Sequence, residues 1–407
     1  MKRIQTLLVD DDSMVLQLVS RVLAKSGNFD CVTAVSGEEA LEKMEKQTFD
    51  VVVSDMNMPF MDGAELLQRV HDLYPETVRL VFSGATDTDM VLKTVGTTHQ
   101  FLSKPEDLKL IESTVRRALY LQEMLPNAEL RRTVSAIENL PSLPSVYMEV
   151  ERELSKPDSS LKQIGALIEE DVGMSAKVLQ LVNSAFFGLR EHVSSPHQAA
   201  SLLGTNILKS LVLMVHVFSE WEGTNGSGLS LADLWSHSMG VATKARTIVE
   251  VEEADRGTRE DIFMGGLFHD LGKLVLAANL AESYAEVIAR AGEGTPLTEA
   301  ERRILGATHA EAGAYLLSLW GFHDDIISAC AFHHAPSAGG IEGLTSALVV
   351  HVANVLDHEL RAGADGSRQQ LESGYLEKQG VSGRLEVWRD ACAGVDNDTG
   401  EEEPSQT

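Results

Sequence analysis

The sequence contains few cysteines, and their spacing matches no metal-binding pair. Cys31, Cys330 and Cys392 are the three cysteines in 407 residues, and no two of them form a CxxC motif. An odd number of scattered cysteines suits a reducing cytoplasm and argues against a zinc–thiolate site. We therefore expect a cytoplasmic protein.

Several other patterns are missing as well. No apolar run approaches the ~20 residues that span a bilayer, and the first residues begin a strand pattern rather than the apolar region of a signal peptide. The P-loop pattern GxxxxGK[ST] and the metalloprotease pattern HExxH do not occur. Lys and Arg number 34 against 61 Asp and Glu, and the formal net charge of −27 opposes non-specific binding to nucleic acid. We expect neither a membrane nor DNA as a partner.

A length of 407 residues predicts two or more domains, and the first of them shows a regular alternation of elements. Short apolar runs predict strands, and apolar residues spaced three and four apart predict helices. The expected strands cover residues 6–9, 31–35, 51–55, 78–83 and 100–103. The expected helices cover residues 13–26, 37–46, 64–74 and 107–124. This order predicts a parallel sheet with helices on both faces.

Polar residues stand at the ends of four of these strands. Asp10 and Asp11 end the first strand, Asp55 the third, Ser83 the fourth and Lys104 the fifth. These side chains should converge at one edge of the sheet, where three carboxylates suit Mg²⁺. Such a site can accept a phosphoryl group: Asp55 attacks the phosphorus, Mg²⁺ and Lys104 offset the charge, and Ser83 bonds a phosphoryl oxygen.

Residues 1–122 resemble a response-regulator receiver domain. The resemblance is carried by Asp10, Asp11, Asp55 in Ser54-Asp55-Met56-Asn57-Met58-Pro59, Ser83, Lys104-Pro105 and the aromatic Phe101. It implies a doubly wound, five-stranded parallel sheet with strand order 2-1-3-4-5. It also implies phosphorylation of Asp55 by a cognate histidine kinase or phosphotransfer protein, and self-association as a phosphorylation-dependent homodimer.

The rest of the chain reads as helical. We expect a helical linker over residues 123–139. The two prolines in Leu140-Pro141-Ser142-Leu143-Pro144 predict an extended segment that begins a second domain, over residues 140–360. From Ser145 onward the apolar spacing is that of helices, including a single helix over 259–277. Residues 361–392 predict a helical extension, and the acidic residues 393–407 a disordered tail.

Histidines cluster in this helical region. They are His237, His269, His309, His333 and His334, with Asp270 directly after His269. Adjacent His and Asp can bind one or two metal ions if other helices bring further ligands, and imidazole with carboxylate suits Fe, Mn, Ni or Zn. The alternative for each single histidine is an ordinary core or surface group.

Leu140 to Leu360 resembles the HDOD branch of the HD superfamily of metal-dependent phosphohydrolases. The resemblance is carried by His237, His269-Asp270, Lys273 and the segments 140–144, 168–174, 181–185, 265–276, 308–320 and 332–336. It implies a regulatory output module that binds a partner protein or a nucleotide-like ligand. Two features depart from the active enzymes: Asn354 stands at the last aspartate of the metal set, and no GYP segment follows His334.

Two functions remain open at this point. The first is a two-component response regulator in which phosphorylation of Asp55 controls an HDOD output module. The second is a phosphorylation-gated metal phosphohydrolase that uses the histidine cluster and Asp270.

Overall fold

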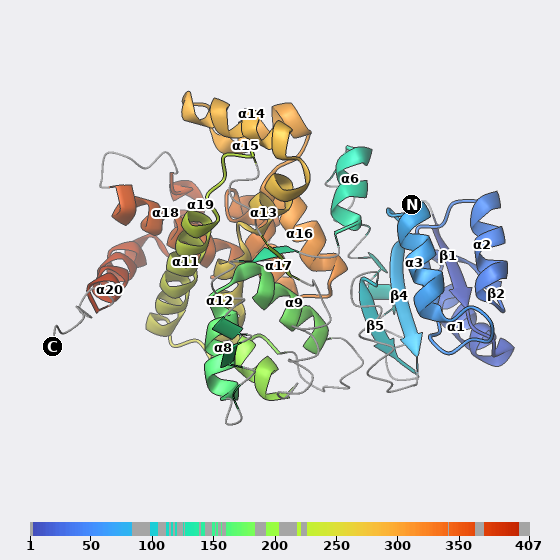
Figure 1. The fold of residues 1–407 in the computed structure, drawn as a ribbon. Coiled ribbons are helices and arrows are strands. Elements are labelled where there is room, and N and C mark those ends of the chain that lie inside the picture. The colour runs from blue at the N-terminus through green and yellow to red at the C-terminus, as the bar shows by residue number, and fades with distance from the viewer. Residues whose placement is uncertain are drawn as a thin grey trace.

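The computed structural model places an α/β unit at the N-terminal end beside a larger helical unit (Figure 1). It describes the chain apart from residues 1–2, 84–97, 105–110, 114, 117–118, 120–124, 126, 138–139, 143–148, 151, 154–155, 157–159, 184–192, 203–217, 221–225, 341, 363–369 and 399–407. Among the helices described, none is both long and apolar enough to cross a membrane.

The α/β unit contains a five-stranded parallel sheet with the order β2-β1-β3-β4-β5, as predicted. Its strands are β1 (Ile4–Val9), β2 (Phe29–Ala34), β3 (Val51–Ser54), β4 (Val78–Ser83) and β5 (Gln100–Ser103). Val51, Val52 and Val53 are all buried because helices cover both faces of the central strand. Val9 pairs with Ser54, and Ser83 with Ser103, so the strands end together at one edge.

Three described helices pack on this sheet, and each begins at the capping residue that the sequence supplies. They are α1 (Ser13–Lys25), α2 (Gly37–Lys46) and α3 (Gly63–Leu73). Asp12, Ser36 and Asp62 accept hydrogen bonds from backbone N–H groups of the first turns. A Cβ at Gly63 would collide with the carbonyl of Asp55, so only glycine lets the chain turn back beside Asp55. The helix predicted over 107–124 lies largely outside the described residues.

The helical unit begins after α6 (Ala128–Ser135). Its helices are α8 (Leu161–Glu169), α9 (Val172–Val182), α11 (Leu231–Val251), α12 (Arg256–Phe268), α13 (Leu271–Asn279), α14 (Ala281–Gly292), α15 (Leu297–Leu305), α16 (His309–Leu319), α17 (Asp324–Phe332), α18 (Ser346–Ala362), α19 (Ser373–Lys378) and α20 (Leu385–Asp398), with short 3₁₀ turns at Pro336–Gly339 and Ser382–Arg384. Buried side chains of α11, α12, α18 and α20, among them Trp388, form a second core beside the main one.

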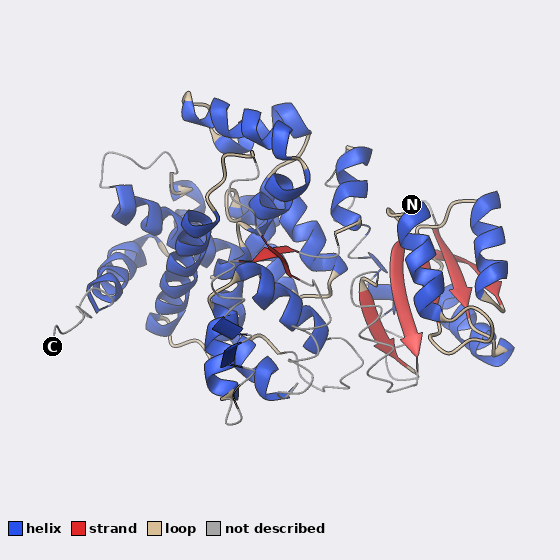
Figure 2. Cartoon of the chain, viewed as in Figure 1, coloured by secondary structure: helices blue, strands red, loops and turns tan. Residues whose placement is uncertain are grey.

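Three details differ from the expectation. The helical domain also contains a small parallel sheet, β6 (Leu140–Ser142) with β7 (Phe218–Glu220), because the extended entry pairs with a distant segment (Figure 2). The helix predicted over 259–277 is broken into α12 and α13, with His269 and Asp270 at the break. Helix α20 continues to Asp398, into the predicted disordered tail, because the fully buried Trp388 and Cys392 anchor it.

Candidate functional site

At the edge of the sheet where the strands end, three of the predicted residues meet directly. The Lys104 Nζ lies 2.5 Å from Asp10 Oδ2 and 2.8 Å from Asp55 Oδ1. Both carboxylates are buried, and backbone N–H groups fix their other oxygens: Asp12 donates to Asp10, and Asn57 donates to Asp55. The more exposed Asp11 lies close enough that carboxylate oxygens of Asp10, Asp11 and Asp55 are all within 4.8 Å of one another.

Lys104 offsets part of the negative charge of the three carboxylates. Burial raises the pKa of Asp10, although the hydrogen bond from Lys104 opposes the rise. Burial alone would lower the pKa of Lys104, but its hydrogen bonds with Asp10 and Asp55 outweigh burial and raise it. Three oxygen donors around one point fit Mg²⁺. Ser83 lies at the end of β4 beside this edge, and the side chains of Ser83 and Phe101 lie outside the described residues.

The predicted histidines of the helical unit also converge, and Asp270 is their shared centre. Its Oδ2 faces His237 Nε2 at 3.6 Å and His269 Nε2 at 3.4 Å. Its Oδ1 faces His309 Nε2 at 3.2 Å and His333 Nε2 at 3.7 Å. The two oxygens of one carboxylate therefore serve two adjoining clusters, of which the second also includes His334.

The break between α12 and α13 creates this arrangement. His269 follows the last residue of α12, and Asp270 precedes the first residue of α13, so both side chains are directed into the space among the helices. A Cβ at Gly272 would collide with the carbonyl of His309, so α13 approaches α16 closely enough to bring His309 to Asp270. His333 lies at the end of α17.

In four of the histidines, the ring nitrogen that points away from Asp270 forms a hydrogen bond. His237 Nδ1 lies 2.7 Å from Asp357 Oδ2, and His309 Nδ1 lies 2.7 Å from Glu301 Oε2. His269 Nδ1 lies 2.6 Å from the Gly266 carbonyl, and His333 Nδ1 lies 2.8 Å from the Cys330 carbonyl. An Nδ1–H that donates outward leaves the Nε2 lone pair facing inward, which is how proteins orient metal-binding histidines.

Three of the inward-facing atoms have no hydrogen-bond partner among the described residues. Among the described residues, His237 Nε2, His269 Nε2 and Asp270 Oδ1 are buried without a hydrogen bond. Buried polar atoms are normally satisfied, because an unpaired one costs about 1–3 kcal/mol. A nitrogen and oxygen donor set of this kind fits transition metal ions, so the residues present fit the metal that the sequence predicts.

The pKa values of several residues in the histidine cluster are strongly shifted. Burial would raise the pKa of Asp270, but His269 and Lys273 outweigh burial and hold it well below its usual value. Burial lowers the pKa of His333 and of His334 well below the ordinary range. For His309, burial acts in the same direction, but the Glu301 carboxylate outweighs it and raises the pKa to about 9.

Two residues of this site were not found from the sequence. Glu301 belongs to α15, a helix that the sequence analysis missed, and it lies eight residues before His309 with no periodic relation to it. Asp357 lies one helical turn after Asn354 on α18, so the spacing of that helix could have indicated it. Asp357 also accepts a hydrogen bond from the buried Lys244, at 3.1 Å. The Asn354 side chain is buried, and its Oδ1 has no hydrogen bond among the described residues.

Comparison with known families divides the chain in two. The model of the response regulator receiver domain matches residues 6–116, and the model of the HDOD domain matches residues 140–336.

Relatives and solved structures share parts of the chain. An uncharacterized protein of Treponema pallidum is 28% identical over 207 residues, which are 49% of this chain and 38% of the relative. The DNA-binding transcriptional regulator NtrC of Escherichia coli is 28% identical over 258 residues, which are 62% of this chain and 49% of the relative. A virulence factor of Campylobacter jejuni shares the fold with a TM-score of 0.50 and 18% identity, covering 68% of this chain and 98% of that structure. The chain thus spans half or less of the length of these two curated relatives.

Proposed function

Because the chain is a response regulator that joins a receiver domain to an HDOD domain, we propose that phosphorylation of Asp55 controls the HDOD domain as its output. The phosphoryl donor in this proposal is a cognate histidine kinase or a phosphotransfer protein. The output acts on a partner protein or a nucleotide-like ligand. Although NtrC is a DNA-binding regulator, the net charge of −27 argues against DNA as the partner of this chain.

The observation that carries the proposal is the position of Lys104 between Asp10 and Asp55. An Asp55 oxygen attacks the phosphorus of the donor, the bond from phosphorus to the donor breaks, and an acyl phosphate forms. The Lys104 ammonium, already within 2.8 Å of Asp55 Oδ1, can then pair with a phosphoryl oxygen. Mg²⁺ held by Asp10, Asp11 and Asp55 would add charge stabilisation for the phosphoryl oxygens.

Phosphoryl transfer can be tested with a small donor. Full-length protein is incubated with radiolabelled acetyl phosphate, with Mg²⁺ or with excess EDTA. We expect label that requires the divalent cation and that is released by mild alkali or hydroxylamine, as an acyl phosphate is. Label that forms equally well in EDTA would contradict the proposal.

The described contacts also offer a route from the receiver to the output domain. The buried Arg79 of β4 donates from Nη2 to the Ser135 carbonyl at the end of α6, at 2.8 Å. The Ser135 hydroxyl lies 2.9 Å from the hydroxyl of Tyr315 on α16. Because α16 begins with His309, this chain of hydrogen bonds joins the sheet of the receiver to a helix of the histidine cluster.

A second contact supports the same route. The Gln100 side chain of β5 donates from Nε2 to the carbonyls of Ser318 and Leu319, at 3.0 and 3.1 Å. Movement of β4 and β5 would therefore act on the C-terminal half of α16. Hydrogen exchange of α6 and α16, measured with and without beryllofluoride as phosphoryl analogue, tests this coupling. Unchanged exchange would contradict it, and sizing of the same samples tests the predicted phosphorylation-dependent homodimer.

We assign the metal of the output domain to the two clusters around Asp270. His237 and His269 would share one ion with Asp270, and His309, His333 and His334 would share the other. Glu301 and Asp357 would orient two of these imidazoles, since each accepts a hydrogen bond from Nδ1. Elemental analysis of the purified protein for Fe, Mn, Ni and Zn is the direct measurement.

A metal phosphohydrolase is the second candidate, and the shared carboxylate of Asp270 favours it. Asp270 would hold metal together with the histidines of both clusters, and the metal would supply charge stabilisation for a phosphate ester and a hydroxide nucleophile. The Lys273 ammonium pairs with Asp270 and remains 16% exposed, so it can meet a phosphate at the edge of the cluster. Turnover of bis-p-nitrophenyl phosphate that requires metal and is lost in His269→Ala and Asp270→Ala would favour the enzyme. Without the GYP segment, we expect no turnover of cyclic di-GMP.

A further inference from the structure

A separate cavity of about 490 Å³ lies within the helical domain, away from Asp55 and from the histidine cluster. One wall comes from the end of α8 and the residues after Val193, and the other comes from α11 and the first half of α12. Three arginines line it: Arg246, Arg256 and Arg259. Its volume is in the range of small-molecule sites.

Each of the three arginines donates a hydrogen bond from its Nε atom. Arg246 donates from Nε to Glu250 at 3.0 Å, and Arg256 donates from Nε to Glu260 at 2.8 Å. Arg259 donates from Nε to the Ala254 carbonyl at 2.7 Å. A guanidinium group has five N–H donors, and each of these bonds uses one of them to orient the group. The terminal amino groups remain available to a ligand. Terminal amino groups on a fixed plane are the geometry that binds phosphate oxygens in pairs.

The charge of the cavity favours an anion. Its lining contains three guanidinium groups and two carboxylates, Glu169 and Glu260. Arg246 and Arg256 are paired with Glu250 and Glu260, whereas Arg259 bonds a backbone carbonyl. Glu169 is in turn paired with His197, with 3.2 Å between Oε2 and Nδ1.

An aromatic side chain completes the lining. Phe263, one turn after Arg259 on α12, is half-buried and forms part of the cavity wall. A flat ring beside phosphate-binding groups suits a nucleobase, because bases stack on aromatic side chains. We propose that this cavity binds a nucleotide, with its phosphate on Arg246 and Arg259 and its base against Phe263. This inference does not depend on phosphorylation of Asp55 or on the metal.

The site would also join two parts of the output domain. Its two walls belong to segments far apart in the sequence, and α12 runs from the arginines to His269-Asp270. A ligand that holds both walls would therefore act on the same helix that positions the histidine cluster.

Isothermal titration calorimetry of the full-length protein in EDTA provides the test, because EDTA removes metal from the clusters. The probes are AMP, GMP, adenosine and pyrophosphate. We expect a nucleotide to bind more tightly than pyrophosphate, and adenosine to bind more weakly than AMP. Arg246→Gln with Arg259→Gln should weaken nucleotide binding about a hundredfold, at roughly tenfold for each lost charged hydrogen bond. Phe263→Leu should weaken the nucleotides and leave pyrophosphate unchanged.

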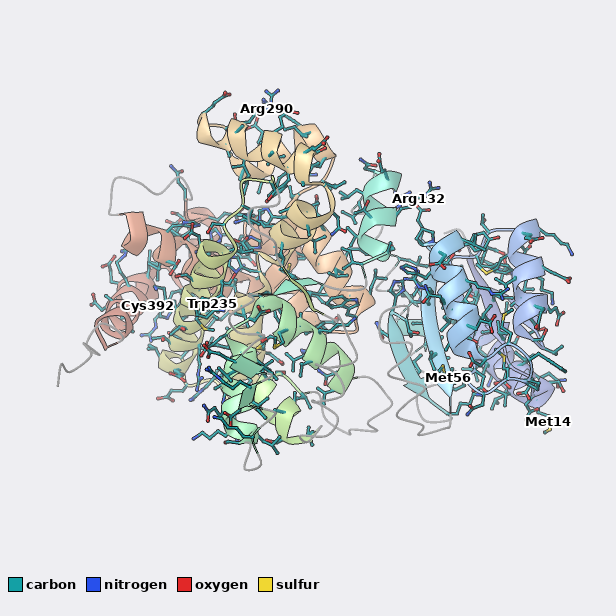
Figure 3. All side chains as sticks on the ribbon, in the orientation of Figure 1. Met14, Met56, Arg132, Trp235, Arg290 and Cys392 are labelled. Carbon is teal, nitrogen blue, oxygen red and sulfur yellow. The ribbon has the colours of Figure 1, made fainter. Side chains whose placement is uncertain are left out.

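Arg290→Gln is the matched control. Arg290 also pairs with a glutamate one turn away on its own helix, Glu286, but it lies on α14 at the far end of the domain from α8 (Figure 3). This variant should bind like the unchanged protein. Three results would overturn the inference: no nucleotide binding at concentrations on the order of 1 mM, equal binding by the double arginine variant, or pyrophosphate binding as tightly as AMP and GMP.

Discussion

In the receiver, the Lys104 ammonium lies between Asp10 and Asp55, whereas in the HDOD domain five imidazoles face one another across the single carboxylate of Asp270. In the receiver, Lys104 and backbone N–H groups bond both carboxylates of Asp10 and Asp55. In the histidine site, the hydrogen bonds of His237 and His269 are made by Nδ1, on the side of the ring away from Asp270. Their Nε2 atoms have no hydrogen-bond partner among the described residues.

This difference predicts that the two proposed sites hold a metal ion with different strength. A lysine that already pairs with two of the carboxylates compensates part of their charge without the ion, so Mg²⁺ can exchange readily. A buried site with unsatisfied nitrogen lone pairs gains more from a bound metal, because nothing else in the described protein satisfies those atoms. We therefore expect Mg²⁺ in the receiver to be lost during purification, and the metal of the HDOD domain to remain.

The largest expected effect concerns the receiver. Asp55→Asn removes the attacking carboxylate but preserves the shape of the side chain, so labelling by acetyl phosphate should fall to background. Asp62→Asn is the control, because asparagine can also accept the hydrogen bond from Glu65 N that begins α3. Persistent label on Asp55→Asn would show that the phosphoryl group resides elsewhere.

The second effect tests the shared carboxylate. Asp270→Asn should lower the metal content of both clusters, because each cluster includes an Asp270 oxygen. His334→Ala should affect only the cluster that contains His309 and His333. Elemental analysis after gel filtration measures both variants, and circular dichroism confirms that they are folded. Equal losses in the two variants would argue for a single ion rather than a pair.

Local signals predicted most of the fold. The β3 strand, the Ser36 cap of α2 and the residues at the strand ends were predicted because each depends on a few neighbouring residues. The cap of α1 is Asp12 and not Ser13, which was expected, because Asp12 accepts the hydrogen bond from Met14 N. The break at His269 and Asp270 was not readable, because apolar spacing continues through it. Just after that break, Gly272 lets α13 lie close to the His309 carbonyl, and this contact joins residues far apart in the sequence.

In the candidate sites, too, local signals were predicted and contacts between distant residues were not. The histidines were recognisable by residue type, but their orientation depends on Glu301 and Asp357, which tertiary packing brings to the Nδ1 atoms. The route through Arg79, Ser135 and Tyr315 joins three segments with no common pattern. Residue type thus predicted which histidines lie together around Asp270, and only the packed structure shows how their rings are held.

The third effect concerns these orienting carboxylates. Glu301→Gln and Asp357→Asn each keep a hydrogen-bond acceptor but remove the charge behind His309 or His237, so metal affinity should fall about 10–100-fold. Competition with a metal-sensitive dye measures the affinity. Glu299→Gln on the same helix is the control, since Glu299 pairs with Arg303 at the surface. Affinity that is equal in all three variants would mean that the carboxylates do not tune the ligands.

The smallest effect uses a buried histidine that belongs to neither site. His99 in the receiver is 4% exposed, like the clustered histidines, but both of its ring nitrogens have protein partners. Its Nδ1 accepts from the backbone N–H of Arg79 at 3.0 Å, so the neutral ring carries its proton on Nε2 and donates to the Ser135 carbonyl at 3.2 Å. Because both ring nitrogens already have hydrogen-bond partners, we expect His99 to bind no metal and to bind a proton weakly.

Burial and the nearby Arg79 hold the pKa of His99 well below 6.5. His99 is therefore neutral in the native state, whereas an opened segment accepts a proton once the pH falls below about 6.5. Stability of the contact between the receiver and α6 should be full above that pH and should fall below it, by at most about 1.4 kcal/mol per pH unit. Hydrogen exchange of α6, corrected for intrinsic rates and compared at pH 7 and 5.5, measures this loss. In His99→Asn the loss should disappear, and in His71→Asn, which alters another contact with the same segment, it should persist. If His99→Asn keeps the full pH dependence, the weakening at acid pH comes from other groups, and His99 does not control this contact.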